Sequence, residues 1–398
     1  MPWKTSSIVL ERQRFALAAL RWIKPFALLC AEYAISRKTG YKWLARYRAG
    51  GAGALRDQSR RPQRCARQKP ARWKRCVRQV RRSRPYWGAK KILARLRELH
   101  PRKRLPVLRT IGRWLRELGL VGLRQRRARS GPAVPHPGLT TPRQLHQVWT
   151  VDFKGWFRTA DGQRHDPLTV REAKSRYLLE IRLLPDQSDG AARRAMTRIF
   201  RRHGMPAAIR VDNGSPFGGK GALGLSRLSV WWLRLGIRVE FTRRARPGDN
   251  AAHEQMHGRY KAEALDPPAG DRRTQQRRTD HWRHDYNHRR PHEALGQKPP
   301  ARAYAPSKRR WPQSLPALCY PKSFAQRRVR PHGDIKWQGR LRFIGRAFAG
   351  QTLGIKTLSP HHCAVHLGAL LIGEIHAKDT PGMRPARWQR LPHKPLKV

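Results

Sequence analysis

The sequence predicts a multidomain protein with an all-α N-terminal part, a central α/β domain and a small C-terminal β-barrel. Apolar residues recur at helical spacing up to about residue 121, and strand-like and helical segments alternate from residue 145. After residue 324, short β-rich segments are separated by regularly spaced glycines. A length of 398 residues corresponds to two to four domains.

Changes in composition along the chain predict where these domains begin and end. Stretches rich in Pro and Arg interrupt the periodic segments, as linkers between domains commonly do. The predicted parts are a helix-turn-helix domain at 1–55, a basic linker at 56–84, a second helical module at 85–123, a linker at 124–144, the α/β domain with a C-terminal helix at 145–310, and the β-barrel at 324–378.

Residues 11–50 read as short helices. Ser36 is a favourable N-cap for a basic helix that runs to about Arg48. A short helix, a tight turn and a basic second helix form the helix-turn-helix layout, whose second helix enters the DNA major groove. The alternative is an amphipathic helix with a solvated basic face. The side chains predicted to face inward are Tyr41, Leu44 and Ala45, and those predicted to contact DNA are Arg37, Lys38, Lys42 and Arg46.

The second helical module is predicted to comprise two helices, at 87–100 and 107–121. The second of them has apolar residues at helical spacing, namely Leu108, Ile111, Leu115 and Leu118. A packing domain that touches no ligand is one interpretation. Basic side chains on both helices favour DNA contact instead; these are Lys90, Lys91, Arg109 and Arg113.

The charge of the chain indicates a polyanionic partner. There are 87 Lys and Arg against 25 Asp and Glu, a formal net charge of +62. Such a chain repels itself unless nucleic acid or another polyanion neutralises it. Residues 1–150 contain 38 of the basic residues and only five acids, whereas residues 151–299 contain 17 of the 25 acids. We therefore expect an N-terminal part that binds DNA and a central domain that contains most of the carboxylates.

The five cysteines form no CxxC pair, so neither a zinc ribbon nor a disulfide framework is predicted. The run His361-His362-Cys363 is predicted to be a loop, because adjacent residues rarely converge on one metal ion. No apolar run approaches 18 residues, and no signal peptide opens the chain. We expect a protein of the bacterial cytoplasm, associated with the nucleoid and with no membrane partner.

Three carboxylates of the α/β domain lie where chemistry is expected. Asp152 lies inside the apolar segment VWTVDF, and burial of a lone carboxylate requires a partner or a cation. Asp212 ends the strand-like AAIRVD, and Glu254 lies on a predicted helix. Together they could chelate two Mg²⁺ ions, with Mn²⁺ as a substitute, and so support in-line phosphoryl transfer. The simpler interpretation of a strand-end aspartate is a turn or cap residue.

Histidines and tryptophans of the same α/β domain are predicted to have roles other than catalysis. His253 and His257 flank Glu254 at the i, i+4 spacing of zinc ligands, but DNA contact is the favoured interpretation. Trp231 and Trp232 are predicted to be core residues.

An ordered set of motifs resembles a known family. The segments are WTVDFKGWF, SRYLL, RVDNGSPF, NAAHE and YNHRRPHEALGQKPPARAY, with SRKTGYKW and WGAKK nearer the N-terminus. This set is similar to bacterial insertion-sequence transposases with an integrase core and an N-terminal helix-turn-helix. The resemblance covers roughly residues 1–310 and implies a ribonuclease H-like fold for about 145–265.

The resemblance also implies a function. Asp152, Asp212 and Glu254 match the family's DDE triad, and Asn213, Gly214 and Phe217 would lie beside the scissile phosphate, Asn213 as a DNA contact. The YNHRRPHEAL segment is interpreted as structural and interface-forming rather than catalytic. The implied enzyme binds terminal inverted repeats and target DNA as a homo-oligomer, and cleaves and joins strands with Mg²⁺. The alternative is a degenerate remnant that only binds DNA.

Three positions depart from the family pattern. Arg244-Ala245-Arg246-Pro247 stands where Pro-Gly-His/Lys-Pro is common, and Ala251 replaces the usual glycine before the glutamate. Lys174 stands where an aromatic residue is expected. Because alanine disfavours the positive φ angles open to glycine, the loop before Glu254 is expected to be stiffer or displaced.

Overall fold

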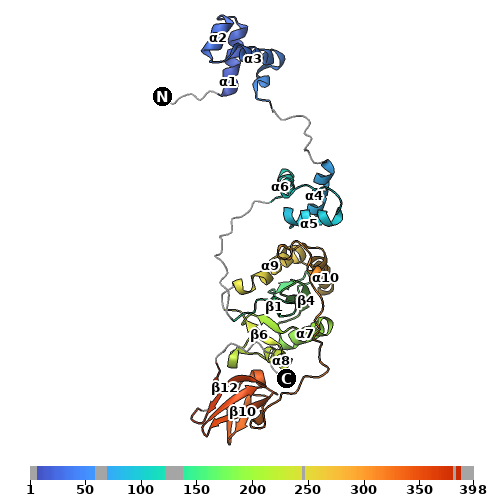
Figure 1. Ribbon diagram of the computed structural model, residues 1–398, viewed down its shortest axis with the longest axis vertical. Coiled ribbons are helices and arrows are strands. Elements are labelled where there is room, and N and C mark those ends of the chain that lie inside the picture. The colour runs from blue at the N-terminus through green and yellow to red at the C-terminus, as the bar shows by residue number, and fades with distance from the viewer. Residues whose placement is uncertain (1–6, 59–69, 122–137, 244–246, 380–381, 387–398) are drawn as a thin grey trace. The chain divides into compact units, whose positions relative to one another are not determined.

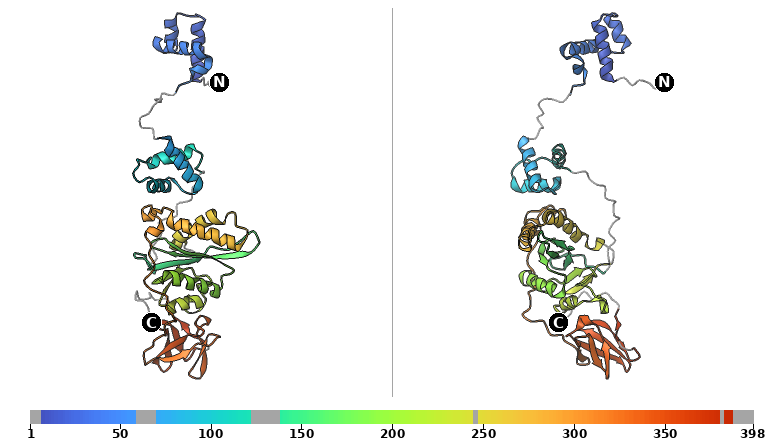
Figure 2. Two further views of the ribbon diagram at one scale, coloured as in Figure 1. Left: turned by 90° about the vertical axis from the view of Figure 1, so that its right-hand side faces the viewer. Right: turned by 180° about the vertical axis from the view of Figure 1, so that it is seen from behind.

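The computed structural model describes residues 7–58, 70–121, 138–243, 247–379 and 382–386. The chain divides into two compact units, Met1–Pro70 and Ala71–Val398. Within the described residues, no helix is both long and apolar enough to span a membrane. Figure 1 and Figure 2 show the helices and strands along the chain.

The first unit is a bundle of three helices, α1 (Ile8–Leu20), α2 (Phe26–Glu32) and α3 (Arg37–Gly50), followed by a 3₁₀ turn at Gly51–Leu55. The predicted N-cap is confirmed, because the Ser36 hydroxyl accepts a hydrogen bond from the Thr39 amide at 3.2 Å. A Cβ on Gly40 would lie 2.6 Å from the Cys30 sulfur, so a glycine is needed where α3 crosses α2.

The inward face of α3 differs in part from the prediction. Leu44 is buried as expected, but Tyr41 is 60% exposed and Ala45 is also exposed. Trp43 is buried instead, and it packs in the core cluster that contains Phe15 and Leu29. Tyr41 stacks on Phe26 at the rim, with ring centroids 4.3 Å apart.

The second unit begins with a helical module of α4 (Ala71–Ser83), α5 (Ala89–Leu99) and α6 (Leu108–Glu117). Residues 71–83 were predicted as linker, and for them the prediction is wrong. Trp73 and Val77 lie one helical turn apart and are buried among arginines that hide the pattern in the sequence. Of the spaced residues in α6, Ile111 and Leu115 are buried, whereas Leu108 is 40% exposed.

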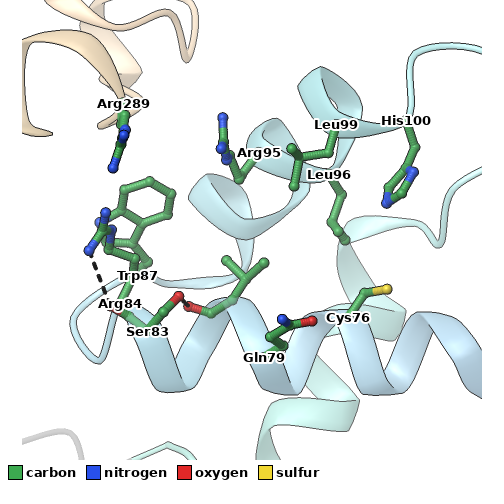
Figure 3. Close-up of a pocket in the computed structure, with 11 residues that line it drawn as sticks. Cys76, Gln79, Ser83, Arg84, Trp87, Arg95, Leu96, Leu99, His100 and Arg289 are labelled. Atoms are coloured by element: carbon green, nitrogen blue, oxygen red, sulfur yellow. Dashed lines mark hydrogen bonds between the residues drawn. The ribbon is translucent and has the colours of Figure 1, made fainter.

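A pocket of about 270 Å³ lies mainly between α4 and α5 (Figure 3). Leu96 and Leu99 of α5 face Cys76 and Gln79 of α4 across it. Its lining residues include no carboxylate, so this pocket is not a candidate for the phosphoryl-transfer chemistry that the sequence predicts.

The central domain is built on one mixed sheet. Its strands are β1 (Val148–Phe153), β2 (Phe157–Arg158), β3 (Arg164–Glu172), β4 (Leu178–Leu184), β5 (Ala208–Val211) and β6 (Arg238–Phe241). The order is β4-β3-β1-β5-β6, with β2 paired to β3; β3 runs antiparallel to its neighbours, and β5 and β6 run parallel to β1. This is the ribonuclease H-like arrangement that the resemblance implies.

Helices cover both faces of this sheet, as the views in Figure 2 show. One face carries α7 (Asp189–His203) and α8 (Arg227–Arg234), which pack on apolar side chains such as Trp149 and Val151. Trp231 and Trp232 of α8 are buried there, as predicted. The other face carries α9 (Ala251–Tyr260), a π-helical turn (Lys261–Leu265) and α10 (Arg272–His288).

The C-terminal part is a β domain. Its strands are β7 (Ala325–Arg328), β8 (Asp334–Trp337), β9 (Arg340–Phe343), β10 (Thr352–Ser359), β11 (His362–Leu367), β12 (Leu370–His376) and β13 (Arg384–Pro385). The described strands form a sheet of order β13-β12-β11-β10-β7 and a β8-β9 hairpin, without the pairing that would close the predicted barrel. The loop predicted at 361–363 is also wrong, because His362 and Cys363 lie in β11.

Candidate active site

Asp152 lies on the polar face of β1. In the antiparallel register, Thr150 lies opposite Arg171 and Asp152 lies opposite Thr169. Because side chains alternate along a strand, these four side chains point to the face covered by α9, while Trp149 and its alternate neighbours enter the apolar core. The alternation in VWTVDF therefore holds Asp152 at the sheet surface, with 22% of its side chain exposed.

Asp212 follows β5, the strand next to β1. The two strands are parallel, with Val148 beside Ala208 and Thr150 beside Arg210, and the same register continued by two residues brings Asp212 to Asp152. Phe217, in the loop after Asp212, is 1% exposed and stacks on Phe153 with ring centroids 5.5 Å apart.

Three residues that follow Asp212 make contacts within the protein. Phe217 is buried and packs inside the domain, and its expected position beside the scissile phosphate stays a prediction. The exposed Asn213 donates its side-chain amide to the Thr242 carbonyl at 2.6 Å and ties the loop to the end of β6. Gly214 donates its amide to the Asp212 carboxylate at 3.1 Å.

Glu254 lies on the exposed side of α9, and the opposite side of the helix packs on the sheet. Met256 and Tyr260 are buried there with Trp282 of α10. His253 and His257 also face the sheet, with exposures of 0% and 7%, so the predicted contact of these histidines with DNA is wrong.

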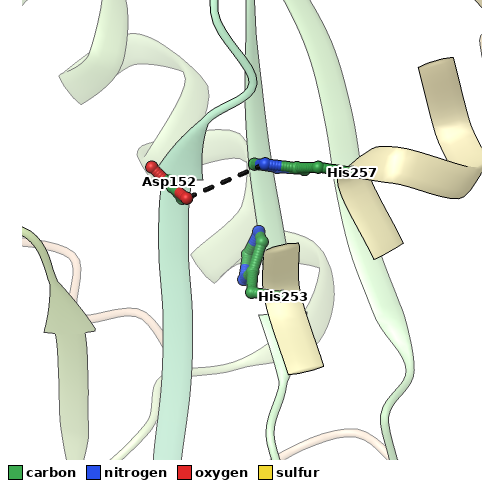
Figure 4. Close-up of side chains that lie close together, drawn as sticks. All are labelled: Asp152, His253 and His257. Atoms are coloured by element: carbon green, nitrogen blue, oxygen red, sulfur yellow. Dashed lines mark ion pairs between the residues drawn. The ribbon is translucent and has the colours of Figure 1, made fainter. Parts of the chain in front are cut away.

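The two histidines join α9 to β1 and β3 through threonine hydroxyl groups. Figure 4 shows both rings beside Asp152. The Thr169 hydroxyl lies 2.6 Å from Nε2 of His253 and 2.7 Å from Nε2 of His257, and it donates to the Asp152 carbonyl at 2.9 Å. Nδ1 of His253 hydrogen-bonds with the Thr150 hydroxyl at 2.7 Å. Both ring nitrogens of His253 are thus engaged within the fold.

Burial keeps these imidazoles neutral. It lowers the pKa of His257 to about 3, with a further contribution from Lys154, and places the pKa of His253 well below its ordinary value. Nδ1 of His257 lies 3.8 Å from a carboxylate oxygen of Asp152. The neutral ring therefore sets the position of α9 relative to Asp152 without adding a positive charge beside it.

The three predicted carboxylates interact electrostatically. The pKa of Asp152 is raised to about 7, first by burial and then by the negative charges of Asp212 and Glu254. Like charges raise a carboxyl pKa in this way only when they lie close together. Asp212 and Glu254 therefore lie near enough to Asp152 for their charges to act on it, whereas the side chains whose ligand atoms lie within 4.8 Å of one another are Asp152, His253 and His257.

The chain is similar in sequence and in fold to known proteins. The family model described as "Integrase core domain" matches residues 235–300, which include Glu254. Two further models match the N-terminal part: "Helix-turn-helix domain" over residues 11–63 and "Homeodomain-like domain" over residues 39–115.

Two curated relatives come from insertion elements. The chain is 30% identical over 192 residues to the "Insertion element IS407 uncharacterized 31.7 kDa protein" of Burkholderia multivorans, which covers 48% of this chain and 66% of the relative. It is 27% identical over 180 residues to the "Insertion element IS476 uncharacterized 39.2 kDa protein" of Xanthomonas euvesicatoria, covering 45% and 50%. The chain is thus similar to proteins of insertion elements, and it contains a match to an integrase core. It spans less than two thirds of the length of each of these relatives.

Solved structures similar to this chain include the HTLV-2 integrase catalytic core domain in complex with magnesium. That likeness has 12% identity and a TM-score of 0.34 over 42% of this chain and 100% of the other. A simian T-cell lymphotropic virus intasome, in complex with PP2A regulatory subunit B56 gamma, has 12% identity and a TM-score of 0.35 over 78% and 99%.

Two of the three departures from the family pattern are accommodated in this chain. Ala251 is the first residue of α9 and is not among the residues with positive φ, so a glycine is not required there. Lys174 is exposed in a turn that the buried Glu172 organises by accepting hydrogen bonds from the Ser175 amide and hydroxyl. Residues 244–246, where the first departure falls, lie outside the described residues.

The basic residues predicted to contact DNA divide by exposure. Most are exposed on α3, α5 and α6: Arg37, Lys38, Lys42, Lys90, Arg109 and Arg113. Arg46 and Lys91 are half-buried, and the Arg46 guanidinium lies 5.0 Å from the centre of the Trp43 ring. Arg113 also pairs with Glu117 at 3.4 Å.

The YNHRRPHEAL signature has the structural role that was predicted. Arg290 is buried, with a side chain 3% exposed, and donates two hydrogen bonds to Glu263, at 2.6 and 2.7 Å. Trp282 donates to the same carboxylate at 2.9 Å. This group ties α10 to the π-helical turn that follows α9. The sequence alone does not indicate a role for Glu263, because a single acid among many basic residues forms no recognisable spacing pattern.

Arg290→Lys is expected to lower the free energy of unfolding by roughly 1–3 kcal/mol, because lysine keeps the charge but cannot make the two parallel bonds to Glu263. Thermal melts would measure this loss. Arg289→Lys is the matched control, since Arg289 is 51% exposed and pairs with Asp285 only at 3.8 Å. Equal melting temperatures for the two variants would contradict the proposed role of the buried pair.

Proposed function

We propose that this protein is a DNA transposase that binds the inverted repeats at the ends of its element and catalyses DNA strand cleavage and strand transfer. Asp152, Asp212 and Glu254 are its proposed catalytic residues. The observation that supports this proposal is the electrostatic effect of Asp212, in the loop after β5, and of Glu254, on α9, on Asp152 of β1, whose pKa is raised to about 7. The match to an integrase core supports the same conclusion.

The residues fit a site for divalent cations. The negative charges of Asp212 and Glu254 raise the pKa of Asp152, and a bound cation would relieve this repulsion. Hard oxygen ligands suit Mg²⁺, for which Mn²⁺ can substitute. Two such ions, when bound, supply charge neutralisation for the attacking and leaving oxygens of an in-line displacement. Asp152 and Asp212 are proposed to hold the ions from adjacent strands, and Glu254 from the helix.

The remaining residues of the site hold these ligands in place. His253, His257 and Thr169 fix α9 against the sheet, so that Glu254 and Asp152 keep their spacing. Phe217 fixes the loop that carries Asp212. Preorganisation of this kind is worth several orders of magnitude in rate when reacting groups must be aligned.

Recognition of DNA is assigned to the N-terminal helices. The exposed basic side chains of α3, α5 and α6 are proposed to contact phosphates and base edges of the repeat, and Asn213 to contact DNA near the proposed site. Both ends of an element must meet in one complex, so the protein is proposed to act as a homo-oligomer on DNA.

A strand-transfer assay tests the proposal. Purified protein is mixed with labelled DNA carrying the ends of its element, a plasmid target and Mg²⁺. We expect joined product from the natural chain and none from Asp212→Asn, with equal binding of both to the end DNA. Specific binding without cleavage in Mg²⁺ or Mn²⁺ would support the alternative, a remnant that only binds DNA.

A further inference from the structure

A second cluster of metal-binding side chains lies on one face of the C-terminal sheet. His362 of β11 lies directly opposite His376 of β12 in the antiparallel register, and Glu374 precedes His376 by two residues on the same strand. Side chains at these positions point to the same face. The intervening Cys363 and Ile375 are buried on the opposite face, while the three polar side chains remain half-exposed.

The distances within this cluster match those of metal ligands. Oε2 of Glu374 lies 3.0 Å from Nε2 of His362 and 3.4 Å from Nε2 of His376. Ligand atoms around a tetrahedral zinc ion, bonded at about 2.0–2.1 Å, lie about 3.3–3.4 Å apart. The two rings lie nearly parallel, at 16° with centroids 4.1 Å apart, and bring both Nε2 atoms to one carboxylate oxygen. The ligand atoms can therefore surround an ion after only small movements.

The carboxylate of Glu374 faces the two rings, and it accepts a hydrogen bond from Nε2 of His362 at 3.0 Å. Arg384 lies opposite Glu374 in the register with β13, but its guanidinium hydrogen-bonds to Asp379 at 2.8 Å. The histidines are thus the hydrogen-bond partners of Glu374 among the described residues.

We propose that His362, Glu374 and His376 bind one transition-metal ion of the zinc class. Two imidazoles and a carboxylate select such an ion over Mg²⁺, which prefers oxygen ligands. Three protein ligands leave a fourth position for water. Because the ligands come from two paired strands, the bound ion clamps β11 to β12 and stabilises the C-terminal sheet. This site does not depend on the proposed strand-transfer activity.

Titration calorimetry with Zn²⁺ on the untagged full-length chain tests the site. Asp152, His253 and His257 form another group able to hold a metal, so Asp152→Asn is introduced throughout to remove it. We expect one bound ion, a higher melting temperature with Zn²⁺, and no competition from millimolar Mg²⁺. His376→Ala and Glu374→Gln should each weaken binding at least 100-fold. His361→Ala, a change at the adjacent exposed histidine, should leave it unaltered.

Three results would overturn the proposal: no Zn²⁺ binding by the parent chain, unchanged binding in both ligand variants, or an equal loss in the His361→Ala control. Glu374→Gln preserves side-chain size, so its fold is maintained even if His376→Ala melts early. As a second measurement, Co²⁺ bound to the parent chain should give the intense visible bands of a four-coordinate site, and Glu374→Gln should remove them.

Discussion

Asp152→Asn is expected to raise the melting temperature of the metal-free protein at pH 8 while it abolishes strand transfer. Burial and the charges of Asp212 and Glu254 raise the pKa of Asp152 from 3.8 to about 7 in the folded chain. A carboxyl with a raised pKa stabilises the fold only while it is protonated. Its contribution is fully present below about pH 4 and is lost as the pH rises through 7.

The size of the effect follows from the pKa difference. Three pKa units correspond to roughly 4 kcal/mol. Asp152 keeps 22% of its side chain exposed, so solvent screening reduces the expected gain to about 2 kcal/mol. Asparagine removes the repulsion and keeps the size of the side chain. Calorimetry of both proteins at pH 5 and pH 8, without divalent ions, would measure a gain that grows with pH.

Divalent cations provide the complementary measurement. Mg²⁺ should raise the melting temperature of the natural chain at pH 8 and leave that of Asp152→Asn nearly unchanged. Asp280→Asn, a change at an exposed carboxylate of α10, is the control and should show the same response to Mg²⁺ as the natural chain. If Asp152→Asn were less stable than the natural chain at pH 8 without metal, the electrostatic account of this site would be wrong.

Gly218→Ala is expected to reduce strand transfer at least 100-fold, because the added methyl group collides with the loop that carries Asp212. A Cβ on Gly218 would lie 2.5 Å from the carbonyl oxygen of Asn213, and backbone atoms cannot rotate away as a side chain can. The Gly218 amide also donates to the Gly214 carbonyl at 2.8 Å. A displacement of about 1 Å in a reacting group can cost 100-fold in rate.

The matched control for this prediction is Gly221→Ala, three residues further along the same loop. A Cβ there meets no atom within 4 Å. We expect Gly221→Ala to keep full activity, and Gly218→Ala to keep binding to the end DNA through the N-terminal helices. Full strand transfer by Gly218→Ala would show that the loop of Asp212 tolerates displacement and that its position is not critical.

Local patterns in the sequence predict much of the fold. Ser36 marks the start of α3 through cap chemistry that involves only neighbouring residues. The alternating pattern around Asp152 likewise predicts a strand with one polar face. The sequence does not reveal the helix at 71–83. Only Trp73 and Val77 form its buried face, and arginines cover most of the rest. The inward position predicted for Tyr41 is wrong, because an aromatic residue can stack at the rim of a core as well as inside it.

The sequence predicts the three carboxylates of the candidate site but not the residues that hold them in place. Each carboxylate lies in a recognisable motif, whereas the partners of His253 and His257 lie more than 80 residues away, on β1 and β3. Spacing within a sequence carries no information about such pairs. His362 illustrates the same limit, because its neighbours Glu374 and His376 become neighbours only through the pairing of β11 with β12.

The order of the elements along the chain has a consequence for synthesis on the ribosome. Domains fold as they emerge, N-terminal first. The helices of the first unit are complete by residue 55, whereas β1, β5 and α9 can bring their carboxylates together only after residue 260 has emerged. If the protein has the proposed function, a nascent chain can therefore bind DNA before its catalytic site has formed.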